Sequence, residues 1–140
     1  MVDDARLQDL FKPLTIGSLK LRNRFAMAPM TRGASPGGIP GADVAAYYAR
    51  RAAGGTALII TEGVRIPHPA AGWPDAVPEL ERPEVLRGWR AVTDAVHAEG
   101  GAIAAQLWHQ GAARGEHEGD SAEQLPVSPS GVDVAGNAVG

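Results

Sequence analysis

The chain has 140 residues, of which 44% are hydrophobic and 21% are charged, and its formal net charge is -3. These values fit one folded domain, typically about 100 to 150 residues long, and exclude a disordered chain and a basic nucleic-acid-binding surface. The absence of cysteine excludes disulfides and thiolate metal sites.

The amino-terminal stretch MVDDARLQDL is acidic and lacks the apolar core of a signal peptide. No apolar run along the chain approaches the ~20 residues that span a bilayer. We therefore expect a cytoplasmic protein that has neither a membrane nor a nucleic acid as its partner.

The first predicted β/α unit consists of a short strand and an amphipathic helix. Residues 24–28, RFAMA, form an apolar run that Pro29 stops, which predicts a buried strand. Residues 42–53 are predicted to be a helix that Asp43 caps and that ends before the glycine pair 54–55.

The same alternation continues through the next two strands. Residues 56–61 are apolar without alternation, as in a strand covered on both faces. Residues 83–99 are predicted to be a helix opened by Pro83, and residues 102–109 to be a third strand. The apolar face of that helix is expected to contain Val85, Leu86, Trp89, Val92 and Val96. Strands that alternate with helices predict a parallel β/α fold.

Long, glycine-rich and proline-rich segments follow each predicted strand. They are residues 29–42, 62–82 and 110–140, whereas connections in β/α units usually have about 2 to 6 residues. In parallel β/α folds, ligands bind at the carboxyl ends of the strands. The sequence therefore predicts a ligand site where these three loops meet.

Polar side chains lie at these strand ends and allow two interpretations. The amide of Gln106 suits a heterocycle edge that alternates acceptors and donors, but it could equally hold a neighbouring loop. Thr31 and Thr61 are typical caps of backbone groups beside turns. His109 is either a packed, hydrogen-bonded histidine or a proton-transfer group.

A second polar cluster allows a metal hypothesis. The stretch GEHEGD, residues 115–120, brings three carboxylates close to one histidine, which is compatible either with an oxygen-rich metal site or with a solvated loop. The solvated loop is the interpretation that we adopt, so no metal is expected. The sequence contains no glycine-rich phosphate-binding motif.

Several motifs together resemble the amino-terminal part of the old yellow enzyme family of FMN-dependent ene-reductases, near its 12-oxophytodienoate-reductase-like and NADH:flavin oxidoreductase members. Their order and spacing extend the resemblance over nearly the whole chain. The motifs are LFKPLTIGSLKLRNR at 10–24, MAPMTR at 27–32, AAYYARRAAGG at 45–55, LIITEG at 58–63, AVHAEGGAIAAQLWHQG at 95–111 and PVSPSG at 126–131.

This resemblance implies a role for particular residues. Gln106 is expected to bond the pyrimidine edge of FMN, and Thr31 to donate a hydrogen bond to the flavin C4 carbonyl. Pro29 and Met30 are expected to pass beside the isoalloxazine, and Gly63 to offer it a backbone group. The remaining residue, Trp108, is expected to line the substrate pocket.

The resemblance also implies the fold and the activity. Family members are TIM (β/α)8 barrels of about 250 residues or more, so residues 1–140 are expected to be the amino-terminal part of an FMN-binding barrel domain. Residues 23–109 would be its first three β/α units, and 110–140 a long active-face loop. The implied reaction is hydride transfer from NAD(P)H to FMN and then to an activated alkene, in an enzyme that could be a homo-oligomer.

The motifs that carry the resemblance do not include all of the family's functional groups. The His or Asn pair that grips the substrate carbonyl, the tyrosine proton donor and the FMN phosphate site all lie outside this chain, so no catalytic residue is assigned. The chain alone is therefore expected to be inactive. The alternative is a non-catalytic module that binds flavin weakly or completes a partner's barrel.

Overall fold

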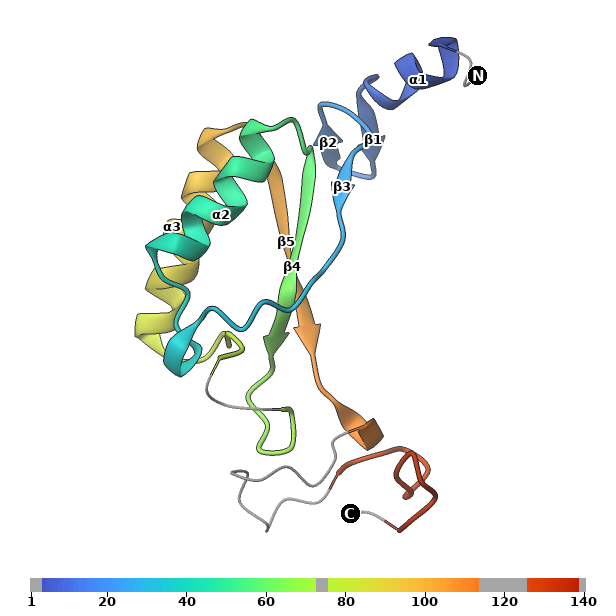
Figure 1. Ribbon diagram of the computed structural model, residues 1–140, viewed down its shortest axis with the longest axis vertical. Helices are drawn as coiled ribbons and strands as arrows, with labels where there is room; N and C mark the ends of the chain where they lie inside the picture. The colour runs from blue at the N-terminus through green and yellow to red at the C-terminus, as the bar shows by residue number, and fades with distance from the viewer. Residues whose placement is uncertain (1–3, 73–75, 114–125, 139–140) are drawn as a thin grey trace.

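The computed structural model describes residues 4–72, 76–113 and 126–138. The elements in chain order are α1 (Asp4–Leu10), β1 (Leu14–Ile16), β2 (Leu19–Leu21), β3 (Ala26–Met27), the 3-10 helix η1 (Pro36–Gly38), α2 (Ala42–Ala53), β4 (Leu58–Arg65), α3 (Pro83–Ala98), β5 (Ala102–Trp108) and the 3-10 helix η2 (Gly111–Ala113). Figure 1 shows α2 and α3 side by side along the long strands, with α1 and the first two strands at the end where β4 and β5 begin.

The central feature is a parallel sheet in the order β3-β4-β5. Ala26 pairs with Leu58, and Leu58 pairs in turn with Ala102, so both strand pairs run parallel. Both helices cover one face of this sheet, and no helix in the described part of the chain covers the opposite face (Figure 1). The predicted parallel β/α arrangement is confirmed.

The core lies between the two helices and the sheet. It is built by apolar side chains at helical spacing on α2 and α3 and by strand residues of β4 that point toward the helices. Its buried members are Val44, Tyr48, Ala52, Ile59, Val64, Val85, Trp89, Val92 and Val96. Leu86, which the sequence placed on the same face, is instead 46% exposed, because it follows Val85 and lies off the buried stripe.

Strand β4 differs from its prediction. The sequence ended it at residue 61 and began a long loop at 62, but the strand continues to Arg65. Its pairing with β5 is irregular between Ile60 and Gly63, since three residue steps on β4 match two on β5. This bulge keeps Thr61 and Glu62 inside the strand. By contrast, β3 is shorter than the predicted 24–28.

The start of α2 also differs from its prediction. The N-cap residue is Gly41, no side chain caps the helix, and Asp43 lies in the first turn. A carboxylate there still interacts favourably with the positive end of the helix dipole. At the other end, Gly55 adopts φ 103, a conformation that favours glycine, so the predicted stop is confirmed.

Three elements near the amino terminus were not predicted: helix α1 and strands β1 and β2. Strands β1 and β2 form an antiparallel hairpin in which Leu14 pairs with Leu21, and its turn contains Gly17 at φ 59. Gly-Ser between two short apolar runs is a hairpin signal. Strands of three residues are too short to show a clear alternation, which explains the omission.

Candidate functional site

The carboxyl ends of β4 and β5 bring two of the predicted residues together. Gly63 and Gln106 are directly paired across the sheet. Thr61 holds the bulge beside them, because its Oγ1 accepts a hydrogen bond from the Gln106 N–H at 3.2 Å and donates one to the Glu62 carbonyl at 2.7 Å. Thr61 therefore caps backbone groups, as the sequence indicated.

The segment that follows β3 reaches the same place through Glu62. The N–H of Arg32 donates to Glu62 Oε2 at 3.0 Å, and its Nη2 donates to Glu62 Oε1 at 3.3 Å. These contacts hold the segment that includes Thr31 against the carboxyl-terminal half of β4. Pro29 is half-buried, whereas Met30 is 51% exposed and Thr31 is exposed.

Trp108 packs against two glycines at this edge of the sheet. A Cβ on Gly63 would lie 3.0 Å from Trp108 Cγ, and one on Gly72 would lie 3.0 Å from Trp108 Cζ3. A side chain at either position would require the indole to move by a few tenths of an ångström, so Trp108 packs closely on Gly63 and Gly72. The packing of Trp108 therefore explains the glycine at position 63 independently of the flavin role that the resemblance implies.

A buried tyrosine secures the bulge from the helix side. The Glu62 N–H donates to Tyr48 Oη at 2.9 Å, and both residues are fully buried. Burial raises the pKa of the Tyr48 phenol above its usual value. The phenol is therefore neutral at physiological pH and accepts this hydrogen bond.

The two histidines at this edge form a pair. Gly111 N–H donates to His109 Nδ1 at 2.8 Å, and His109 Nε2 lies 3.3 Å from His68 Nδ1. His68 Nδ1 also accepts a hydrogen bond from Ala70 N–H at 3.1 Å. These contacts support the interpretation of His109 as a packed, hydrogen-bonded histidine that links the loops after β4 and β5.

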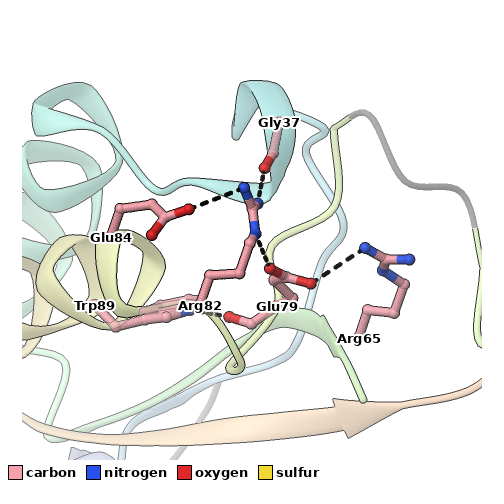
Figure 2. Close-up of polar contacts among 6 residues, drawn as sticks. All are labelled: Gly37, Arg65, Glu79, Arg82, Glu84 and Trp89. Carbon is pink, nitrogen blue, oxygen red and sulfur yellow. Dashed lines mark hydrogen bonds and ion pairs between the residues drawn. The ribbon is translucent and has the colours of Figure 1, made fainter. Parts of the chain in front are cut away.

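A second buried carboxylate fastens the loop that precedes α3 (Figure 2). Glu79 accepts hydrogen bonds from Arg65 Nη2 at 3.3 Å and from Arg82 Nε at 2.5 Å. Its carbonyl accepts another from Trp89 Nε1 at 2.8 Å, and Arg82 also donates to the Gly37 carbonyl. This network joins the end of β4 to α3 and η1.

The sequence analysis assigned no role to several residues that make these contacts, among them Arg32, Tyr48, Glu62 and Glu79. The available signals were an acidic residue two positions after the apolar run LII and a tyrosine on the apolar face of a helix. Charged residues are almost never fully buried unless they are paired, so each buried carboxylate implied an arginine partner without identifying it.

The metal hypothesis and a hollow in the surface concern other parts of the chain. The stretch 115–120, which carried the metal hypothesis, lies outside the described residues, and the described part of the chain has no group of three or more metal-ligating side chains. A hollow of about 440 Å³ lined by Phe11, Asn23, Phe25 and Gly55 lies at the opposite end of the sheet. Among residues 4–72, 76–113 and 126–138, no helix is long and apolar enough to cross a membrane.

Comparison with known proteins gives a consistent set of relatives. The family described as "NADH:flavin oxidoreductase / NADH oxidase family" matches residues 9–139. Flavin oxidoreductase hxnT of Emericella nidulans is 40% identical over 95% of this chain and 34% of its own length. The 12-oxophytodienoate reductase 7 of Oryza sativa subsp. japonica is 42% identical over 74% of this chain and 26% of its own length.

A solved structure agrees with these relatives. Morphinone reductase in complex with tetrahydroNAD is similar with a TM-score of 0.68 and 45% identity, over 73% of this chain and 27% of that chain. The chain thus spans about a quarter to a third of the length of the proteins that it matches.

Proposed function

Because the chain belongs to the NADH:flavin oxidoreductase / NADH oxidase family, we propose that it forms the amino-terminal part of the flavin site of an FMN-dependent ene-reductase. FMN is the cofactor of this family, and its members are oxidoreductases. The sheet β3-β4-β5 and its helices are β/α units of the (β/α)8 barrel that these enzymes share, and the described strands do not close that barrel.

One observation carries the proposal: three proposed flavin contacts meet at neighbouring strand ends. Gly63 and Gln106 are direct partners on β4 and β5. The Arg32 N–H bonds the Glu62 side chain, so Thr31 and Gly63 are each one residue away from this contact. Ligands of parallel β/α folds bind at this end of the strands.

The donor set at this edge fits a flavin ring. The side chains of Gln106 and Thr31 have no hydrogen-bond partner within the described residues, so an amide and a hydroxyl are available to an outside ligand. The alternative, in which Gln106 holds a neighbouring loop, has no such contact to support it there. A flavin edge presents the alternating acceptors and donors that an amide can satisfy.

We assign the ring site to Pro29, Met30, Thr31, Gly63 and Gln106. Gln106 would pair with the pyrimidine edge, and Thr31 would donate a hydrogen bond to the flavin. Trp108, which packs on Gly63, would form a wall of the substrate pocket. When bound, FMN supplies the hydride chemistry between NAD(P)H and an activated alkene. The tetrahydroNAD complex of morphinone reductase supports a nicotinamide dinucleotide as the donor.

The test is a chimera in which residues 1–140 replace the aligned segment of morphinone reductase; we call it the completed barrel. We expect it to purify with bound FMN and to oxidise NAD(P)H when cyclohexenone is added. A folded completed barrel that binds no FMN, even when FMN is added in excess, would contradict the proposal.

The chain alone is expected to lack this activity. Orienting an alkene against a hydride donor accounts for several kcal/mol of a reaction barrier, and the carbonyl grip and phosphate site that the family uses are not among the residues assigned here. We expect no enone-dependent NAD(P)H oxidation by the purified chain with added FMN, and much weaker flavin binding than in the completed barrel. Turnover above a free-flavin control would refute this expectation.

The alternative of a module that completes a partner's barrel has one observation in its favour. Strand β5 is an edge of the described sheet, and Leu107 on it is 66% exposed, as expected for a strand that lacks its neighbour. Mixing the chain with the remaining part of morphinone reductase as a separate polypeptide tests this. Recovery of FMN binding on mixing would favour the module.

A further inference from the structure

Glu62 is a fully buried carboxylate in the middle of a strand, beside the proposed flavin contacts. Burying a carboxylate is costly unless it is paired and hydrogen-bonded. Both of its oxygens are satisfied by one residue, since Oε2 accepts from the Arg32 N–H and Oε1 from the Arg32 guanidinium. The pair therefore joins the segment after β3 to strand β4, and not two residues of one local turn.

Arg32 is itself held in place. Its guanidinium carbon lies 3.6 Å from the centre of the Tyr47 ring, and its side chain is 19% exposed. The arginine thus bridges the aromatic face of α2 and the carboxylate of β4. Within the described part of the chain, residues 29–34 make no hydrogen bonds other than those from Arg32 to Glu62.

The backbone bond has a direct consequence for the preceding residue. The N–H of Arg32 belongs to the same planar peptide unit as the carbonyl of Thr31. Fixing this N–H against Glu62 therefore fixes the plane from which Thr31 projects. Met30 and Thr31 remain exposed next to it, so they are presented to a ligand without being buried by the protein.

We propose that Glu62 is a positioning residue for the flavin site, which acts through Arg32 to hold Met30 and Thr31 at the end of β4. This inference rests on the proposed function. It predicts that Glu62 influences bound flavin without touching it, and that the influence passes through Thr31.

The first test needs no flavin. In the Glu62→Gln variant of the completed barrel, the Arg32 amide loses a charged acceptor, so its hydrogen exchange should become at least about tenfold faster. The exchange rates of amides in α3 serve as the internal reference. An unchanged rate at Arg32 would overturn the proposal.

The second test measures the flavin. We expect Glu62→Gln to raise the Kd for FMN by roughly tenfold and to shift the flavin absorption spectrum. In a Thr31→Ala background the same change should have a smaller effect, because contacts that act through one residue are not additive. Full additivity, or an unchanged Kd and spectrum, would overturn the proposal.

Glu79→Gln is the matched control, because Glu79 is also buried and bonded to arginines but holds the loop before α3. It should lower the thermal stability while leaving the FMN Kd and spectrum unchanged. If Glu62→Gln does not fold, Glu62→Asp decides, since it keeps the charge but withdraws the carboxylate from the Arg32 N–H. An unchanged Kd and spectrum in that variant would refute the positioning role.

The two proposals fail in different ways. A parent completed barrel without FMN refutes the proposed function and, with it, this inference. A parent that binds FMN beside a Glu62→Gln variant with the same Kd, spectrum and Arg32 exchange refutes only the inference.

Discussion

We propose two roles for Gln106, one for its backbone and one for its side chain. Its N–H is bonded to Thr61, whereas its side-chain amide has no hydrogen-bond partner among the described residues and is proposed to bind the flavin. In the completed barrel, Gln106→Leu should keep the fold and weaken FMN binding by about 1 to 3 kcal/mol, since the polar flavin edge would then face an apolar group. Flavin fluorescence titration measures this loss.

Thr31→Ala is the companion variant and should act mainly on the flavin reduction potential, because it removes the donor that we propose for the flavin C4 carbonyl. The two readouts separate the roles of the residues. If Gln106→Leu leaves both the affinity and the potential unchanged, Gln106 returns to a purely structural role.

Helix α3 approaches the segment before α2 at a glycine. A Cβ on Gly88 would lie 2.5 Å from the carbonyl oxygen of Pro40. Alanine normally stabilises a helix interior by about 1 kcal/mol relative to glycine. Here we expect Gly88→Ala to destabilise the completed barrel by about 1 to 3 kcal/mol instead, because the added methyl overpacks the contact.

Urea denaturation of the completed barrel measures this effect. Ala91→Gly, at an exposed position of the same helix, is the control and should cost only the helix-propensity difference of about 1 kcal/mol. A gain in stability for Gly88→Ala would mean that α3 can move away from Pro40.

At the scale of the whole molecule, the described residues place helices on one face of the sheet only (Figure 1). Strands β3 and β5 are the edges of the described sheet, and Leu107 is largely exposed. We expect the isolated chain to be marginally stable, since unpaired edges and uncovered apolar faces favour association.

Thermal unfolding followed by circular dichroism, together with sedimentation, tests this expectation. Aggregation or a broad transition is expected for the chain, and a sharp transition for the completed barrel. A monomeric chain with a sharp, cooperative transition would contradict the expectation.

Much of this fold was predictable because its signals are local. Apolar runs bounded by Pro29 and by the glycines after α2 defined three strands and two helices, and their alternation fixed the parallel sheet. The same rule placed Thr31, Thr61 and Gln106 at one edge of the sheet, since the carboxyl ends of parallel strands lie together. The identity of the ligand came from the family resemblance and not from the spacing.

Only the tertiary structure decided which residues far apart in the chain contact one another. Arg32 and Glu62 are separated by 30 positions, and the irregular pairing that turns Glu62 inward arises only when β4 meets β5. The indole of Trp108 likewise explains Gly63 only after folding. A local pattern indicates that a carboxylate, Glu62, lies close after an apolar run. The free energy of burying it, however, depends on which cation the fold places beside it, and here that cation is Arg32.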